Sequence, residues 1–192
     1  MKHLFLIIAL SFSLTSLGQF RHEPYKEWQF SVGVNTVVNL GERNPFFSPD
    51  KWAFKRPIAI SAERGLSEYL GIDFNLSLNG FNKGDQIDGM TLPEDYNYLS
   101  ADASLKYYFG RQLFTNYNAS WFDLYALAGP GYFVIDESNL SLNLGGGVIF
   151  WLNDDQRLGI KLQSTAKFAI DAKEYLVDNN HFQYHLQMVF KL

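Results

Sequence analysis

The stretch "YLGIDFNLSLNGF", residues 69–81, decides the fold. Its even positions from Leu70 to Leu78 are all apolar, and the odd positions between them carry glycine, aspartate, asparagine or serine. Alternation with a period of two residues predicts a β-strand with one apolar and one polar face. The pattern is longer than an ordinary strand of about five or six residues. It matches the roughly 9 to 11 residues that a tilted strand needs to cross a bilayer.

Alternation of this kind recurs along the chain in eight segments. They are residues 27–40, 55–65, 68–82, 96–110, 121–134, 138–152, 156–170 and 181–192. Several connections are short, such as 64–67 and 153–156, whereas 41–54, 82–95 and 171–180 are longer. Short turns on one rim and long loops on the other are typical of outer-membrane barrels. The sequence therefore predicts an all-β fold, an eight-stranded antiparallel up-and-down transmembrane β-barrel.

The N-terminus predicts export. Residues 1–20, "MKHLFLIIALSFSLTSLGQF", have a basic start, an apolar stretch and small residues near Gly18, which is the layout of a cleaved signal peptide. We expect a signal peptide over 1–18, a short periplasmic segment over 19–26 and a barrel over 27–192 in the bacterial outer membrane. Beyond the signal, no apolar run approaches the roughly 18 residues of a membrane helix.

Composition excludes several kinds of function. The chain has no cysteine, so disulfides and thiol catalysis are ruled out. Its formal net charge is -4 and it has no basic cluster. Because proteins bind phosphate groups with clustered lysine and arginine, nucleic acid is not an expected partner.

The polar face of the strands should line the barrel interior. Following the parity of residues 69–81 around the barrel places nine side chains inside: Glu63, Asp73, Asp102, Lys106, Asp123, Lys161, Lys167, His185 and Lys191. Enclosed charges persist only when they are paired and hydrogen-bonded, so four carboxylates and four lysines predict an internal polar network. An eight-stranded barrel is only just wide enough for its own side chains. We therefore expect a closed polar lumen, and the alternative is a narrow ion channel.

Catalysis and metal binding have weak support in the sequence. A lipid-modifying outer-membrane enzyme is a further alternative, with His181, Asp178 and Ser138 as conceivable partners, but nothing in the pattern brings these three together. His181 and His185 would lie about 13 Å apart on a strand, too far for one metal ion. The acidic loop 82–95 lacks the ligand spacing of a calcium loop. We expect no catalytic residue, no metal and no cofactor.

The loop 41–54 is rich in aromatic residues. Exposed aromatics often mark a contact surface, so a contact site for another outer-membrane protein is predicted at Phe46, Phe47, Trp52 and Phe54. The alternative is that these rings fold over the barrel mouth. The leading hypothesis is a non-enzymatic barrel that serves as a structural or accessory subunit of an envelope complex. A soluble lipocalin-like barrel, with its apolar residues inside, is the structural rival.

Two stretches carry a resemblance to a known family. "LNLGGGVIFWLNDDQRLGIKLQSTAKF", residues 142–168, and "NHFQYHLQMVFKL", residues 180–192, resemble strands of the eight-stranded outer-membrane barrels of Bacteroidota, which are similar in form to the OmpA transmembrane domain and belong with porin-family barrels. The resemblance is specific over about 140–192. Larger relatives continue into a periplasmic peptidoglycan-binding domain, which we do not expect in this protein.

The last strand gives the most regular pattern of all. Its expected lipid face consists of Phe182, Tyr184, Leu186, Met188, Phe190 and Leu192. This strand should pair with the first, because a barrel in lipid leaves no unsatisfied edge. The resemblance implies that such a strand is also the signal recognised by the barrel assembly machinery, so outer-membrane lipid and that machinery are the expected partners.

Overall fold

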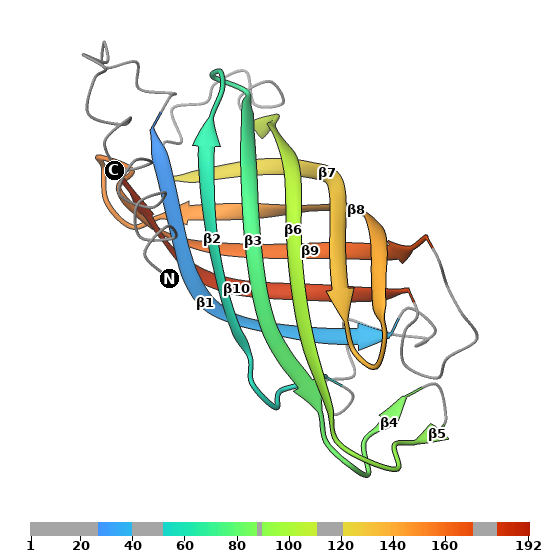
Figure 1. Cartoon of the computed structure of the whole chain (residues 1–192). Coiled ribbons are helices and arrows are strands. Elements are labelled where there is room, and N and C mark those ends of the chain that lie inside the picture. The colour runs from blue at the N-terminus through green and yellow to red at the C-terminus, as the bar shows by residue number, and fades with distance from the viewer. Residues whose placement is uncertain (1–26, 40–51, 88–89, 111–120, 171–179) are drawn as a thin grey trace, which may run out of the picture.

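Eight long β-strands dominate the computed structural model, which describes residues 27–39, 52–87, 90–110, 121–170 and 180–192 (Figure 1). They lie within three residues of the expected segments at each end. The strands are β1 (Trp28–Asn39), β2 (Ile58–Gly65), β3 (Leu70–Phe81), β6 (Tyr96–Tyr108), β7 (Phe122–Val134), β8 (Ser138–Trp151), β9 (Leu158–Ala169) and β10 (His181–Lys191). Two short strands, β4 (Gln86–Ile87) and β5 (Met90–Thr91), form a hairpin that the sequence pattern did not predict.

The long strands close into one antiparallel barrel in the order β1-β10-β9-β8-β7-β6-β3-β2. Neighbours in the sequence are neighbours in the wall, and β10 pairs with β1 from Gln29–Lys191 to Asn39–His181. The predicted eight-stranded up-and-down barrel is therefore confirmed. The turns 66–69 and 152–157 lie at the same end as the C-terminus, which we call the turn end; the β4–β5 hairpin lies at the opposite, loop end (Figure 1).

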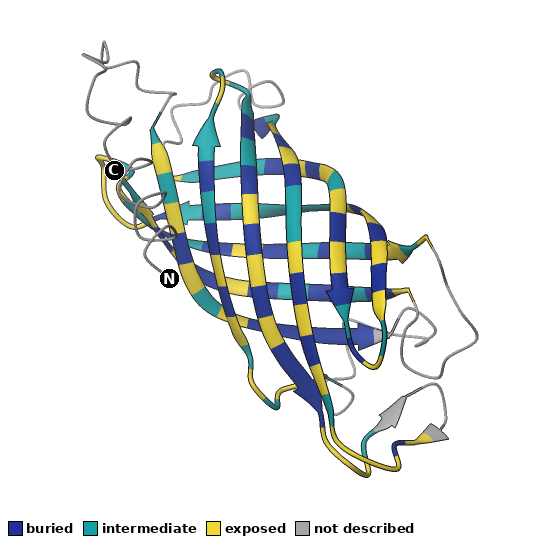
Figure 2. Cartoon of the chain, viewed as in Figure 1, coloured by how far each residue is buried: buried dark blue, intermediate teal, exposed yellow. Residues whose placement is uncertain are grey.

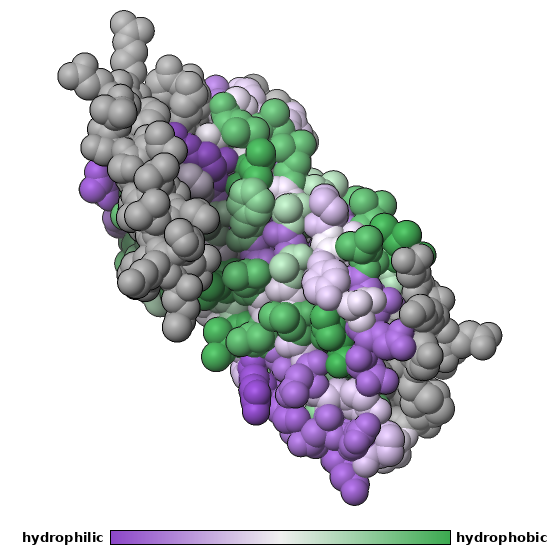
Figure 3. Space-filling model, in the orientation of Figure 1, coloured by the Kyte–Doolittle hydropathy of each residue, from purple (hydrophilic) through white to green (hydrophobic). Residues whose placement is uncertain are grey.

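Burial alternates along the strands and shows which face points inward (Figure 2). Apolar side chains face outward and stay exposed, as for Phe74 at 55% and Leu142 at 50%, whereas Asn143 and Lys167 are fully buried. Successive side chains of a strand point to opposite faces, so the pairing register of the strands determines which residues point inward all around the barrel. On the face shown in Figure 3, apolar side chains cover the middle of the barrel and polar ones gather at the loop end. Among the described helices, none is long and apolar enough to span a membrane.

The wall between β1 and β3 is irregular at the loop end. β2 pairs with β1 only as far as Gly33, so the part of β1 after Gly33 has no ladder with β2. Side-chain amides join the strands there, together with isolated backbone bonds from Ala53 N–H to the Val37 carbonyl at 3.1 Å and from Lys55 N–H to the Gly80 carbonyl at 3.4 Å. Asn35 Nδ2 donates to the carbonyls of Ile58 at 2.8 Å and Leu78 at 2.9 Å, and Asn79 Nδ2 donates to those of Asn35 at 3.0 Å and Ala53 at 2.9 Å. Two amides and these isolated backbone bonds thus take the place of a continuous ladder.

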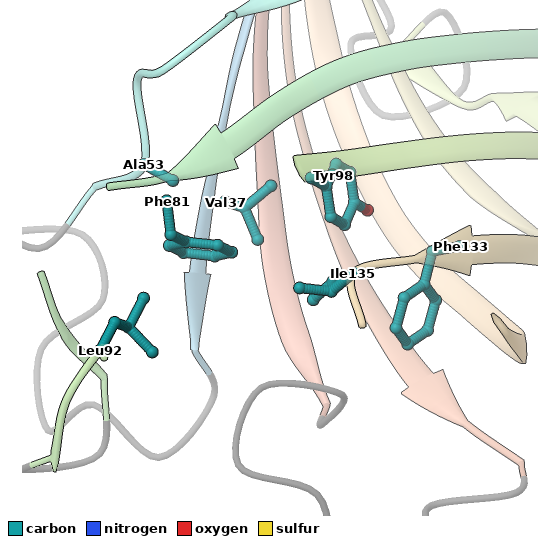
Figure 4. Close-up of a cluster of buried hydrophobic side chains, with 7 residues drawn as sticks. All are labelled: Val37, Ala53, Phe81, Leu92, Tyr98, Phe133 and Ile135. Atoms are coloured by element: carbon teal, nitrogen blue, oxygen red, sulfur yellow. The ribbon is translucent and has the colours of Figure 1, made fainter. Parts of the chain in front are cut away.

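Apolar side chains close the interior near both ends. At the loop end they are Val37, Ala53, Phe81, Leu92, Tyr98, Phe133 and Ile135 (Figure 4). Nearer the turn end they are Tyr125, Leu127, Ile149, Trp151 and Val189. The inner face is therefore less uniformly polar than the alternation predicts. Leu92 comes from the loop after β5 and is only 2% exposed, so part of the loop 82–95 packs onto the barrel mouth.

Candidate functional site

The polar interior is the candidate site because it gathers most of the charged groups of the barrel wall. Six of the nine residues predicted to face inward are at most 4% exposed: Glu63, Asp73, Lys106, Lys161, Lys167 and His185. The Asp102 side chain is 7% exposed, and that of Lys191 is 21% exposed near the turn end. Asp123 is half-buried. Seven of these groups form three separate arrangements rather than one network, and Asp123 and Lys191 line a cavity at the turn end.

The first arrangement is centred on the ammonium group of Lys106. It lies 2.8 Å from Glu63 Oε2 and 3.2 Å from Asp73 Oδ1. Tyr108 Oη donates to Glu63 Oε1 at 2.6 Å, and the ring of Tyr125 lies beneath the ammonium at 4.7 Å. Strands β2, β3 and β6 are adjacent, so the ladder register places these groups side by side. Two carboxylates share one lysine, which leaves a surplus negative charge.

The second arrangement lies closer to the loop end. Lys167 Nζ donates to both carboxylate oxygens of Asp102 at 2.8 Å. Asn143 Nδ2 also donates to Asp102 Oδ1 at 2.8 Å, and Ser141 Oγ donates to Asn143 Oδ1 at 2.8 Å. Strands β6, β8 and β9 are thereby connected across the interior. A buried ion pair with this many charge-assisted hydrogen bonds is the form in which enclosed charges persist.

The third arrangement surrounds Lys161 and His185. Lys161 Nζ donates to Ser61 Oγ at 2.9 Å, and among the described residues no carboxylate lies within ion-pair distance of it. His185 Nε2 lies 3.2 Å from Ser77 Oγ and 3.3 Å from Asn75 Nδ2. The four carboxylates and four lysines are therefore not paired one to one, since Lys106 has two carboxylates and Lys161 has none.

A cavity of about 450 Å³ opens at the turn end. Its lining includes Glu63, Asp123, Trp151 and Lys191. Trp151 Nε1 donates to Asp123 Oδ2 at 2.7 Å, and Lys191 pairs at 3.4 Å with Glu27, which the sequence reasoning had not placed in the interior. The cavity therefore reaches inward as far as a carboxylate of the Lys106 arrangement.

The conceivable catalytic group is not assembled by the described residues. His181 is 3% exposed and faces inward, where its Nε2 lies 2.9 Å from Tyr98 Oη and its ring stands edge-on to Phe133. His181 is therefore a buried packing residue. Asp178 lies outside the described residues. Within the described part of the chain, no group of three potential metal ligands occurs.

The outward face carries the terminal strand and part of the predicted contact site. Phe182, Tyr184, Leu186, Met188, Phe190 and Leu192 are half-buried or exposed. Trp52 packs against Tyr184 and Phe54, with ring centroids 5.8 Å and 6.1 Å apart, and Phe54 is 50% exposed. The rings of Trp52 and Phe54 thus lie on the outer wall. Phe46 and Phe47 lie outside the described residues.

Sequence reasoning missed three tyrosines that provide hydrogen-bond partners for polar groups of the interior. Tyr98 and Tyr125 are buried and Tyr108 is half-buried, and their hydroxyl groups hydrogen-bond with His181, Gln163 and Glu63, respectively. Their inward positions could have revealed this role, because the hydroxyl group of a tyrosine that points into the barrel needs a polar partner.

Comparisons with known proteins agree with the fold. No protein-family profile matches the sequence, and no curated protein matches it. Among solved structures, the outer membrane protein OprG from Pseudomonas aeruginosa is 13% identical with a TM-score of 0.56, covering 88% of this chain and 96% of that chain. Neisserial surface protein A is 12% identical with a TM-score of 0.52, covering 86% and 95%. Ail of Yersinia pestis is 16% identical with a TM-score of 0.50, covering 87% and 99%. At these identities the likeness shows a shared fold, the eight-stranded barrel of outer-membrane proteins.

Proposed function

We propose that this chain is a non-enzymatic integral protein of the bacterial outer membrane, a structural or accessory subunit of an envelope complex with a closed interior. The observation that carries the proposal is the inverted distribution of polarity. Phe74, Leu76 and Leu78 are about half exposed on the wall, while Lys106 and Lys167 are fully enclosed. An apolar outer surface of this kind suits contact with lipid. The closed barrel also leaves no backbone N–H or C=O of the wall without a partner, which a membrane-spanning structure requires. The shared fold with outer-membrane barrels supports the location.

The packing of the interior supports a closed barrel rather than a diffusion pore. The Lys106 and Lys167 ion pairs cross the interior at two levels, and the apolar group that includes Phe81, Leu92 and Phe133 packs at the loop end. A barrel of eight strands has just enough room for such side chains. Planar-bilayer recordings of the purified barrel should show no discrete conductance. A reproducible single-channel conductance would favour the narrow ion channel instead.

Membrane fractionation tests the location directly. The chain should stay with outer membranes after a carbonate wash, and its gel mobility should change on heating because an unheated barrel stays folded. Release by carbonate, or a mobility that does not depend on heating, would favour the soluble lipocalin-like alternative.

Partner contacts are proposed through the outer wall near Trp52 and Phe54. The exposed ring of Phe54 extends the aromatic surface formed by Trp52 and Tyr184. A pull-down from detergent-solubilised membranes should return a partner with the native chain and less of it with the Trp52→Ala/Phe54→Ala variant. Leu142→Ala on β8 is the matched control, because Leu142 is an apolar residue of the outer wall that is also 50% exposed. Recovery of the monomer alone would count against the role in a complex.

Assembly by the barrel machinery is proposed from the terminal strand. Phe190 and Leu192 are 42% and 76% exposed at its end. Replacing both with serine should reduce insertion into outer membranes in cells, while leaving spontaneous refolding of the purified chain into detergent less affected. Equal loss in both assays would indicate a stability defect instead. The origin in Bacteroidota rests on the resemblance of the last three strands.

A further inference from the structure

The cavity at the turn end has more acidic than basic groups in its lining. It contains one ammonium group, from Lys191, and four carboxylates, from Glu27, Glu63, Glu68 and Asp123. Lys106, which is not part of the lining, pairs with Glu63 at 2.8 Å, and Lys191 pairs with Glu27 at 3.4 Å. Among the described residues, no lysine or arginine lies within ion-pair distance of Asp123. The described lining therefore carries an excess of negative charge.

Asp123 is a half-buried carboxylate that a neutral donor holds in place. Trp151 Nε1 donates to Asp123 Oδ2 at 2.7 Å, and Trp151 itself is only 7% exposed. These two residues lie on β7 and β8, which are paired in the wall, so the hydrogen bond joins adjacent strands. A carboxylate that is partly removed from water is stabilised by a cation beside it. The tryptophan orients the carboxylate but leaves its charge in place.

The ammonium group of Lys191 shows which chemistry the cavity accommodates. It lies 3.4 Å from Glu27 Oε2 and 5.8 Å from the centroid of the Trp151 ring. A cation within about 6 Å of the centre of an aromatic ring is attracted by the face of that ring. The lining thus already holds one alkylammonium group with a carboxylate and an indole ring. This contact is independent of the number of acidic residues, and it identifies the same kind of group as the partner for Asp123.

The size and lining of the cavity suit a small organic molecule. Its volume of about 450 Å³ lies within the range of roughly 300–1,000 Å³ that is usual for small-molecule sites. Leu70 and the rings of Tyr108 and Trp151 add apolar surface to the carboxylates of the lining. A metal ion would use the carboxylates alone, and an anion would be repelled by them. A flexible alkyl chain with ammonium groups uses both kinds of surface.

We propose that the turn-end cavity is a binding site for a small linear diamine or polyamine. One ammonium group pairs with Asp123 and contacts the ring of Trp151, and a second lies toward Glu68 at the exposed rim. The alkyl chain between them contacts Leu70. Lys191 then competes with the ligand for the ring of Trp151. This inference goes beyond the proposed role in a complex, because it requires only the folded barrel.

NMR titration of the detergent-refolded barrel with cadaverine tests the site. With the indole nitrogens labelled, the Trp151 Nε1–H resonance should shift and reach saturation, and a Trp151→Phe variant assigns it. Trp121, which is 57% exposed and stacks on Phe150, is the control in the same barrel and should not shift. The uncharged diol of the same length and Mg²⁺ at equal ionic strength should leave the Trp151 resonance unchanged. An equal shift with Mg²⁺ would indicate general charge attraction and overturn the proposal.

Charge variants locate the ligand within the cavity. Asp123→Asn keeps the acceptor for the Trp151 indole but removes the charge, so cadaverine should bind about tenfold more weakly. Lys191→Met removes the competing ammonium group and should tighten binding, whereas Asp95→Asn at the loop end should leave the affinity unchanged. Heat-dependent gel mobility shows whether each variant is folded, and Glu68→Gln at the exposed rim replaces Asp123→Asn if the latter is not. Unchanged affinity in the acidic variant, or weaker binding by Lys191→Met, would overturn the proposal.

Discussion

Loss of the Lys106 charge is expected to destabilise the barrel more than any surface change. Lys106→Met keeps most of the side-chain volume but leaves Glu63 and Asp73, both about 3% exposed, without their cation. Breaking a buried ion pair by removing one partner costs about 3–5 kcal/mol. Since about 1.4 kcal/mol corresponds to a factor of ten, the folding equilibrium should fall by about two to four powers of ten.

The assay is urea-induced unfolding of the barrel in phospholipid vesicles, followed by tryptophan fluorescence and by heat-dependent gel mobility. Lys191→Met is the matched control, because its ion pair with Glu27 spans 3.4 Å and its side chain is 21% exposed. Such a pair should contribute at most about 1 kcal/mol. If both variants lose the same stability, the buried pairing is not what stabilises this part of the interior.

A compensated variant separates the loss of charge from the loss of packing. Lys106→Met combined with Glu63→Gln and Asp73→Asn removes all three charges while keeping similar volumes. Replacing a whole buried ion group with neutral residues is often nearly neutral for stability. The triple variant should therefore recover most of the stability lost by the single variant. A triple variant no more stable than Lys106→Met would refute the electrostatic explanation.

Three further outcomes are expected. Gly71→Ala should lower the urea midpoint, because its β-carbon would lie 2.5 Å from Glu63 Oε1, and an unchanged midpoint would show that this carboxylate is free to shift. The native barrel should show no conductance, whereas the Lys106→Ala variant should leak ions. A Lys106→Ala variant without conductance would indicate that the apolar clusters near the two ends close the barrel. The backbone N–H of Lys83 and the ammonium of Lys55 lower the pKa of Asp95 below its ordinary value. The amide shift of Lys83 should therefore stay constant as pH falls through the usual aspartate range and change only below it, and a midpoint at that of a model peptide would contradict this.

The alternation in the sequence was sufficient to predict the strands of the barrel wall and which side chains face inward. Strict alternation over 69–81 and 181–192 reflects a wall with an apolar outer face and an enclosed inner face. A shift of the strand register by one residue would exchange the two faces. Parity alone therefore located Lys106, Lys161 and Lys167 inside. It could not assign partners, since Lys106 and Glu63 are 43 positions apart and meet only through the ladder register.

The ends of the interior were harder to predict. Phe133 and Ile149 occupy inward positions where the alternation pattern predicts polar residues. These apolar residues can be recognised as clusters only once the fold brings together strands from distant parts of the chain. The packing of Leu92 onto the loop end depends on the unpredicted β4–β5 hairpin, whose strands of two residues are too short for periodicity to reveal.

The wall beside Asn35 and Asn79 differs mechanically from the rest of the barrel. In a continuous ladder each backbone bond is supported by its neighbours, whereas a join made by a side-chain amide can be released by rotation about one or two bonds. Exchange of backbone hydrogens should therefore be fastest along the second half of β1 on the side that faces β3. We expect any sideways opening of the barrel wall to begin beside Asn35 and Asn79.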